Sequence, residues 1–169
     1  ELGLGGAGSE GVRIEPEQAL LGRLAVFAGG CTLHAAETVC SGGGIDPGAV
    51  FELLASLVAR SLVVAEESGP ESRYRLLETI RQYGEERLDR AGETEQWRAR
   101  HAGYYADLPR QVREHDRGRD EVFWAVRLSA EQDNLLAAWS WAVDTSNVDA
   151  AFAILAGFAP CEVWSSYPL

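Results

Sequence analysis

The residues nearest the start of the chain have a spacing that could bind phosphate. Gly3 and Gly8 are separated as the two glycines of a phosphate-binding loop are. Such a loop also needs a Lys that reaches the phosphate and a hydroxyl that holds magnesium, but Ser9 and Glu10 occupy those positions. The sequence therefore predicts a glycine-rich linker over residues 1–14, with no bound cofactor and no catalytic residue.

Cys31, His34 and Cys40 are close together and are of types that bind metals. Structural zinc sites usually pair their ligands in short knuckles and add a fourth ligand. No fourth ligand is evident here, so we predict buried free thiols, a surface His34 and no metal site. His101 falls in an aromatic stripe at helical spacing, which favours a core or boundary residue over a catalytic base.

The chain is acidic along its whole length, which bears on nucleic-acid binding. Its 169 residues hold 26 acids and 15 Arg, a net charge of −11. Residues 1–92 hold 14 acids and 8 Arg (−6), and residues 93–169 hold 12 acids and 7 Arg (−5). A phosphate backbone repels such a surface, and nucleic-acid binders normally carry a basic face. Neither half is therefore a basic module concealed by an acidic one.

The cysteines and the hydropathy indicate the compartment. Three cysteines cannot all pair within one chain, and no secretory signal is evident, which favours free thiols in a reducing cytoplasm. No apolar run reaches the roughly 18 residues that a membrane span requires. We therefore expect a cytoplasmic protein without a membrane partner.

The apolar spacing predicts a mainly α fold that begins with a winged helix over residues 15–92. Helical spacing, interrupted by glycines and by the Asp46-Pro47 start signal, predicts three successive helices. These helices are expected over 15–28, 32–40 and 46–60. Two short strands around a polar turn then predict a β-hairpin over 62–76, and a fourth helix follows and stops at Gly92. This order is that of a winged helix, whose third helix reads DNA in DNA-binding relatives.

Residues 93–169 show helical spacing only. Short turns between helices predict a helical repeat-like segment that is truncated at its end. Pro109 is expected to kink or end the first helix, and the Ser129-to-Gln132 spacing predicts a capping box for a later one. Most of the aromatic residues are expected to pack between helices. They are Trp97, Tyr104, Tyr105, Phe123 and Trp139. Trp124 and Trp141 fall outside the main stripes and are candidates for a partner surface.

The presumed reading helix and the wing lack the charge that DNA binding needs. The helix over 46–60 carries Asp46, Glu52 and Arg60, a net charge of −1, and the wing over 65–72 carries three Glu and no Arg. A DNA-reading version would place Arg or Lys on both. DNA contact through this segment is therefore not expected, and Glu52 and Arg60 join Trp124 and Trp141 as candidates for an interaction surface.

Four segments together resemble a known bacterial family. They are LAVFAGGCTL (24–33), LVARSLVV (57–64), YRLLETIRQY (74–83) and EQDNLLAA (131–138). The chain is similar to the region that follows the nucleotide-binding domain in large regulatory ATPases of the signal-transduction (STAND) class, the AfsR-like or LuxR-family regulators of actinobacteria. The resemblance implies a winged helix followed by tetratricopeptide-like helices. It also implies that an adjoining ATPase domain is the partner of this segment.

Two hypotheses about function follow. The first is a non-catalytic regulatory and interaction module that relays the nucleotide state of an ATPase core to helical repeats, with protein partners. The second is a DNA-binding winged-helix transcription factor. The acidic reading helix favours the first hypothesis, since a fold does not fix a function.

Overall fold

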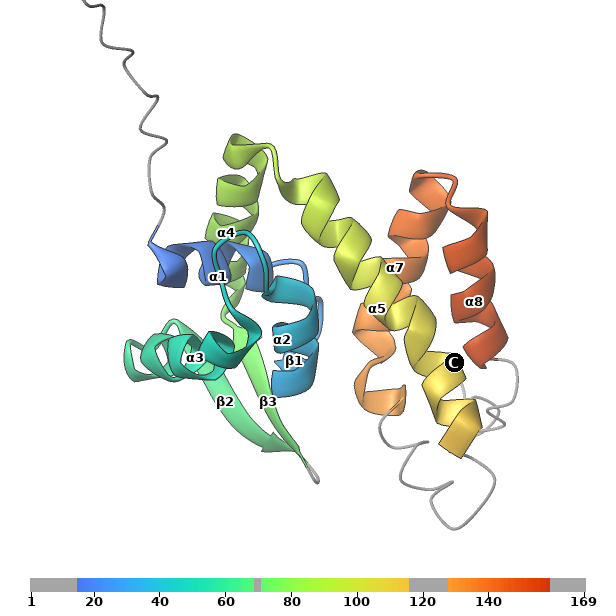
Figure 1. Ribbon diagram of the computed structural model, residues 1–169, viewed down its shortest axis with the longest axis horizontal. Helices are drawn as coiled ribbons and strands as arrows, with labels where there is room; N and C mark the ends of the chain where they lie inside the picture. Colours follow the sequence, from blue (N-terminus) through green and yellow to red (C-terminus); the bar gives the residue numbers. More distant parts are fainter. Residues whose placement is uncertain (1–14, 69–70, 116–127, 159–169) are drawn as a thin grey trace, which may run out of the picture.

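The computed structural model describes residues 15–68, 71–115 and 128–158 (Figure 1). The predicted linker over 1–14, Phe123, Trp124 and Cys161 lie outside these residues. The fold is mainly helical, with a small antiparallel sheet, and a winged helix precedes a helical region. This confirms the fold class that the sequence predicts.

The winged helix contains four helices and a β-hairpin in the predicted order, together with one short additional strand. The helices are α1 (Pro16–Leu24), α2 (Leu33–Cys40), α3 (Val50–Ala59) and α4 (Glu78–Ala91), and the strands are β1 (Cys31–Thr32), β2 (Val63–Ser68) and β3 (Glu71–Leu76). Local capping explains where two of the helices begin. The Thr32 hydroxyl accepts a hydrogen bond from the Ala35 amide at 3.2 Å, and the Asp46 carboxylate accepts one from Gly48 at 2.8 Å before a single 3-10 turn (Pro47–Ala49) leads into α3.

The sheet has the order β1-β3-β2, with Cys31 opposite Tyr74 and Val63 opposite Leu76. The β2–β3 hairpin confirms the predicted wing. The strand β1 is not predicted, because two residues are too few to show a period. Gly30 makes this pairing possible. Its φ is +79°, and a Cβ there would lie 2.8 Å from the Tyr74 carbonyl oxygen, so only glycine fits.

One hydrophobic core joins the sheet to the helices of the winged helix. Leu24, Phe27, Leu54, Leu57 and Val63 are buried in it. Leu76 and Ile80 pack against the same core.

Two details of the prediction for the winged helix are wrong. The helix α1 ends at Leu24 instead of continuing to the glycine pair at 29–30, and the chain bends through turns before β1. The helical spacing of Leu77, Ile80, Tyr83, Gly84 and Leu88 predicts that all five lie on the buried side of α4, but Leu77 and Tyr83 are about half exposed. Gly84 does lie at the close contact between α1 and α4, where a Cβ would lie 2.9 Å from the Ala25 Cβ.

The helical region packs α7 (Gln132–Asp144) and α8 (Val148–Phe158) against the long helix α5 (Thr94–His115) (Figure 1). The predicted stripe is confirmed, because Trp97, His101, Tyr105 and Leu108 are all buried. Pro109 lies inside α5, so the expectation that it ends the helix is wrong. Tyr105 and Leu108, which precede the proline in α5, are buried. Their packing keeps the helix intact although Pro109 has no backbone N–H to donate.

Two further predictions for this region are also wrong. The residue before α7 is Glu131, and its side chain makes no capping hydrogen bond. Its carboxylate instead binds Arg73 and Tyr105, so the predicted capping box does not form. Trp139, which is expected to pack between helices, is 37% exposed.

Candidate functional site

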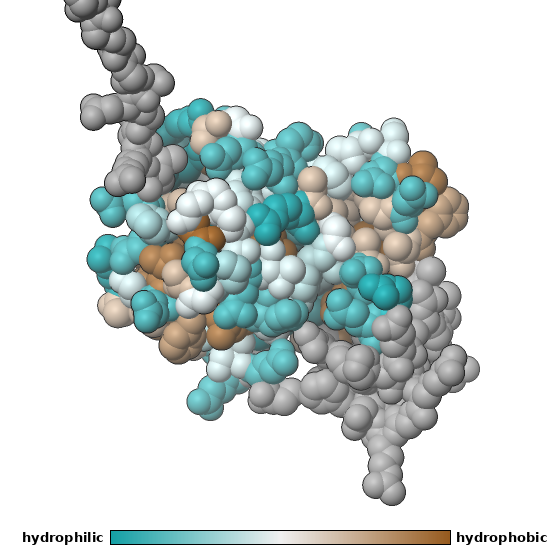
Figure 2. All heavy atoms as spheres, in the orientation of Figure 1, coloured by the Kyte–Doolittle hydropathy of each residue, from teal (hydrophilic) through white to brown (hydrophobic). Residues whose placement is uncertain are grey.

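The outer face of α3 is apolar where a DNA-reading helix would be basic. Phe51, Ala55 and Ala59 recur at intervals of four and are exposed, and Figure 2 shows hydrophobic side chains over this part of the molecule. Glu52 is exposed beside them. Arg60, which follows the helix, forms an ion pair with Glu17 of α1 at 2.7 Å. This face of α3 therefore presents apolar side chains, and the cation that follows it, Arg60, is already paired with Glu17.

The wing also lacks free positive charge. Glu66, Glu67 and Glu71 are exposed on the hairpin, and Arg75 pairs with Glu66 at 2.7 Å. The wing is therefore acidic where a DNA-binding wing would meet phosphates.

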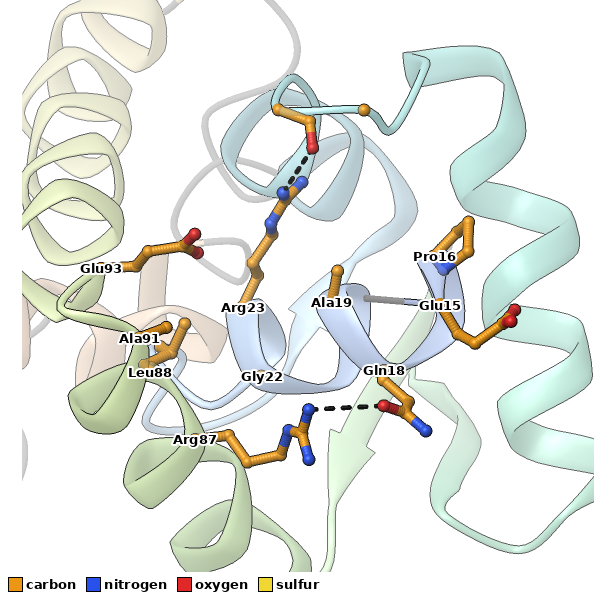
Figure 3. Close-up of a pocket in the computed structure, with 12 residues that line it drawn as sticks. Glu15, Pro16, Gln18, Ala19, Gly22, Arg23, Arg87, Leu88, Ala91 and Glu93 are labelled. Atoms are coloured by element: carbon orange, nitrogen blue, oxygen red, sulfur yellow. Dashed lines mark hydrogen bonds between the residues drawn. The ribbon is translucent and has the colours of Figure 1, made fainter. Parts of the chain in front are cut away.

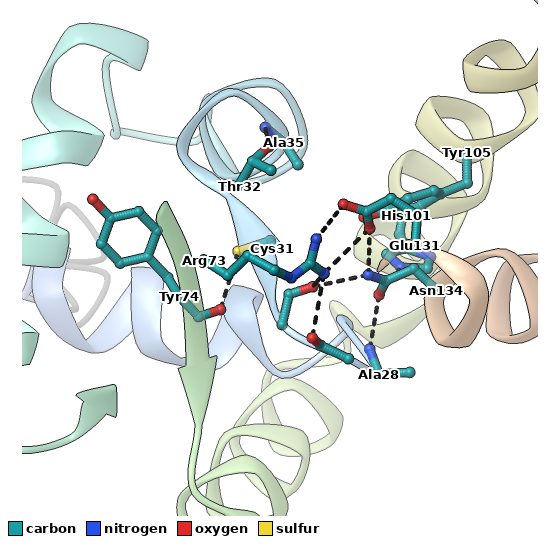
Figure 4. Close-up of polar contacts among 12 residues, drawn as sticks. Ala28, Cys31, Thr32, Ala35, Arg73, Tyr74, His101, Tyr105, Glu131 and Asn134 are labelled. Carbon is teal, nitrogen blue, oxygen red and sulfur yellow. Dashed lines mark hydrogen bonds and ion pairs between the residues drawn. The ribbon is translucent and has the colours of Figure 1, made fainter. Parts of the chain in front are cut away.

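A buried polar cluster joins the winged helix to the helical region (Figure 4). We call it the junction, and its members are Arg73 of β3, the loop residues 28–30, His101 and Tyr105 of α5, and Glu131 and Asn134 at the start of α7. At its centre Arg73 donates to Glu131 at 2.6 Å. The Arg73 and Glu131 side chains are only 12% and 4% exposed. The Tyr105 hydroxyl also donates to Glu131, at 2.8 Å.

Asn134 ties the α1–β1 loop to α7. Its amide nitrogen donates to the Gly30 carbonyl at 2.8 Å and to Glu131 at 2.9 Å, and its amide oxygen accepts from the Ala28 backbone at 2.9 Å. The His101 Nε2 lies 3.3 Å from the same oxygen. Every polar group of this amide therefore has a partner, as burial requires.

The environment of the junction shifts the pKa values of its groups. Burial acts against the charge of Arg73, but hydrogen bonding and attraction to Glu131 raise the pKa of its guanidinium above the ordinary value. Burial, followed by the charge of Glu131, raises the pKa of Tyr105 well above its usual range, so the phenol stays protonated. Burial lowers the pKa of His101 to about 4, against the smaller opposing effect of Asn134. The imidazole is therefore neutral at pH 7.

The low pKa of His101 makes stability depend on pH. The ordinary value is 6.5 and the folded value is about 4, so the unfolded chain binds more protons between these values. Stability should therefore fall as the pH drops from about 6.5 towards 4, and the loss should be smaller in His101→Gln. Urea unfolding at several pH values measures this, with His34→Gln on the exposed side of α2 as the control. Equal pH dependence in wild type and His101→Gln would contradict the assignment.

A second set of contacts fixes α2 to α5. Arg23 is buried and donates to the carbonyl oxygens of Cys40 and Gly42, at 2.7 Å in both cases. Its guanidinium lies over the Trp97 ring, 4.0 Å from the ring centroid, and that of Arg100 lies 5.0 Å from the same centroid. Arg100 also donates to the Thr38 carbonyl, at 2.7 Å. These contacts hold the end of α2 against the start of α5.

A groove of about 620 Å³ runs along α1 beside these contacts (Figure 3). Its charged lining consists of Arg23, Arg87, Glu15 and Glu93, whose charges cancel. Arg23 is already bound to backbone carbonyls and Arg87 to Gln18. The groove therefore has no charge preference for an anionic ligand such as a nucleotide phosphate.

The two cysteines among the described residues are inert thiols in this fold. Cys31 and Cys40 are buried and unpaired, and His34 is exposed, as predicted. Burial raises the pKa of Cys31 well above its ordinary value and that of Cys40 to about 12. Within the described ranges, no three His, Cys, Asp or Glu side chains are grouped to hold a metal ion. In the same ranges, no helix has the length and hydropathy that crossing a membrane requires.

The predicted interaction residues lie in different places. Glu52 and Arg60 are exposed at α3, on the opposite side of Figure 1 from α7. Trp141 of α7 is partly buried, and its indole donates to the Glu95 carboxylate at 3.2 Å. It is therefore anchored to α5 instead of standing free.

Sequence reasoning did not identify the junction as a site. Two of the segments that carry the family resemblance, 24–33 and 131–138, meet there. A usable signal was present in the second of them, because Glu131 and Asn134 are polar and one helical turn apart, directly before the buried Leu135. Their partner Arg73 is far away in sequence, so the pairing itself could not be read.

Comparison with known proteins agrees with the geometry of the first half. Residues 15–89 match the family described as the winged helix-turn-helix domain. A Mycobacterium tuberculosis protein with the provisional name HTH-type transcriptional regulator is 36% identical over 156 residues, which cover 92% of this chain. A Mycobacterium bovis protein with the same provisional name matches equally well. An uncharacterized Mycobacterium tuberculosis protein is 40% identical over 100 residues, 57% of this chain and 25% of the relative.

This chain spans 17% of the length of the two relatives named as regulators. No solved structure matches it. The order of helices, the wing and the matched family agree over the same residues. Residues 15–89 therefore have the fold of a winged helix and match the winged helix-turn-helix domain family over the same stretch.

Proposed function

We propose that the chain is a non-catalytic, cytoplasmic regulatory module. In this proposal the winged helix binds the surface of another protein domain. The junction then makes the helical region move together with the winged helix. In a longer protein the docking surface would belong to an adjoining ATPase core, and the helical region, as a tetratricopeptide-like array, would receive a partner or signal. The longer relatives and the family resemblance support this assignment, while the activity of the whole protein is part of the proposal.

The buried junction is the observation that carries the proposal. A relay requires that one element cannot move without the other. Arg73 leaves the wing strand and is held by Glu131 of the helical region, and Asn134 is bonded to the loop that leads into β1. Separating the two regions would break these contacts and expose the apolar core that Tyr105, Leu108 and Leu135 share with the winged helix, which is costly. The winged helix and the start of α7 are therefore expected to move as one body.

Distance measurements between spin labels test this rigidity. One label replaces exposed Ala55 on α3 and the other replaces exposed Ser140 on α7, in a chain whose Cys161 is changed to Ser. Because Cys31 and Cys40 are buried, they should not take up label. We expect one narrow distance distribution. A broad distribution in the otherwise unchanged chain would refute the relay.

The alternative function, DNA binding, has support from the names of the relatives. The charges of the reading helix and wing oppose it. We expect no saturable shift of duplex DNA in a gel assay at about 50 mM salt, where electrostatic binding is strong. Specific binding of a duplex that Arg60→Ala weakens would establish the alternative, because Arg60 directly follows α3 and is exposed. Ala55→Asp places a negative charge on the same face of α3, so it should weaken such DNA binding as well.

A further inference from the structure

Exposed hydrophobic side chains gather on α7 and α8. Nine large hydrophobic residues are exposed among the described ranges, and six of them belong to these two helices. They are Leu136, Trp139 and Val143 on α7 and Val148, Phe152 and Leu155 on α8. Figure 2 shows hydrophobic residues at the outer edge of this helix pair. Scattered exposed apolar residues are ordinary, but a concentration of them marks an interaction site.

The six residues follow helical spacing, so each helix carries a stripe. The α7 stripe recurs at intervals of three and four, and the α8 stripe does the same. Other residues of the two helices fill the interior, since Leu135, Ala138 and Ile154 are buried. Each helix is therefore apolar on two sides, of which one packs on α5 and the other is exposed, as far as the described residues show. We call the second side the α7–α8 face.

The charged residues that α7 and α8 themselves carry are all negative. Neither helix contains Arg or Lys. Asp133 lies three residues before Leu136, and Asp149 lies three residues before Phe152, so each acid is a helical neighbour of a stripe residue. Asp144 is exposed at the end of α7. A partner that covers the stripes must therefore meet acids at their border.

We propose that the α7–α8 face docks an amphipathic helix that carries Arg or Lys beside its apolar stripe. Two neighbouring helices that both expose an apolar stripe form a surface on which the apolar side of a third helix can pack. Basic residues on that helix would pair with Asp133 and Asp149, whereas acidic ones would be repelled. A second copy of this chain is disfavoured, because its own face would bring the same acids. This inference does not depend on the relay, since it rests on the exposed stripes and not on the contacts of Arg73, Glu131 and Asn134.

A displayed library of helical peptides tests the proposal against the immobilised 169-residue chain. Each peptide has an apolar stripe of varied composition and random charged residues beside it. We expect enriched peptides to carry Arg or Lys at those positions. Their affinity should fall at least about tenfold in Phe152→Asp, and it should also weaken with added salt, because exposed charge pairs are screened. Phe51→Asp, a matched change on α3, should leave the affinity unchanged.

Three results would overturn the proposal. Enrichment of acidic or uncharged peptides would refute the charge preference, and an absence of enriched peptides would refute the docking face. Concentration-dependent self-association in sedimentation, abolished by Phe152→Asp, would show that a second copy occupies the face. Because Phe152 is 67% exposed, its replacement should not impair folding, and circular dichroism with a thermal melt verifies this.

Discussion

Replacing Arg73 with Ala should lower the free energy of unfolding by about 3–5 kcal/mol. The guanidinium lies 2.6 Å from Glu131 in a setting where the carboxylate is almost wholly buried. Removing one partner of such a pair leaves the other charge without compensation in a poorly hydrated place. This loss includes the cost of leaving the Glu131 charge unpaired. It should therefore exceed the small difference in stability between the ion pair and a pair of apolar side chains of similar size. Urea unfolding followed by circular dichroism measures it.

Arg75 offers a matched control two residues along the same strand. Its ion pair with Glu66 has the same kind of geometry, at 2.7 Å, but the two side chains are 54% and 48% exposed. Arg75→Ala should therefore cost no more than about 1 kcal/mol. Equal losses in the two variants would show that the junction is no more than a surface contact.

A double change separates buried charge from lost packing. Arg73→Met removes the cation but keeps an unbranched side chain, and Glu131→Gln removes the charge that would be stranded. If the stranded carboxylate causes the loss, the double variant should be more stable than Arg73→Met alone. The Arg73→Ala variant is also given the two spin labels, at positions 55 and 140. Arg73→Ala should broaden the distance distribution, which links the stability effect to the proposed relay.

The elements that sequence predicted well are those specified by neighbouring residues. Thr32 and Asp46 are caps because a short oxygen-bearing side chain satisfies an amide two or three residues later, and such a rule is local. The wing follows from alternating residues around a polar turn. Gly92 ends α4 with φ of +69°, as its place after the helical stripe indicated. The division of the winged helix into elements was thus available without coordinates.

The features that sequence missed depend on distant residues. The strand β1 is defined only by pairing with Tyr74 and Arg73, more than forty positions away along the chain. Pro109 is tolerated because its neighbours are held by tertiary burial, which overrides a local rule. Trp139 has the spacing of a core residue, but whether a stripe is covered depends on which helix lies beside it. The junction combines both causes, because it pairs Arg73 with Glu131 across 58 positions.

Leu54→Ala should lower the free energy of unfolding by about 2–5 kcal/mol, with a sharp fall in melting temperature. Leu54 of α3 has no exposed surface and lies in the core shared with Leu57 and Val63. Truncation removes buried methyl groups and leaves a cavity that the surrounding helices and sheet fill only in part. Thermal melts and urea unfolding measure the effect.

Glu52→Ala is the control on the other side of the same helix. Glu52 is exposed and is not part of the core, so its replacement should change the free energy of unfolding by no more than about 0.5 kcal/mol. The pair also bears on function, because a protein-docking α3 needs a stable inner face and an outer face that is free to make contacts. If Glu52→Ala destabilised the chain as much as Leu54→Ala, the outer face of α3 would be part of the folded core. It would then not be free to contact another protein.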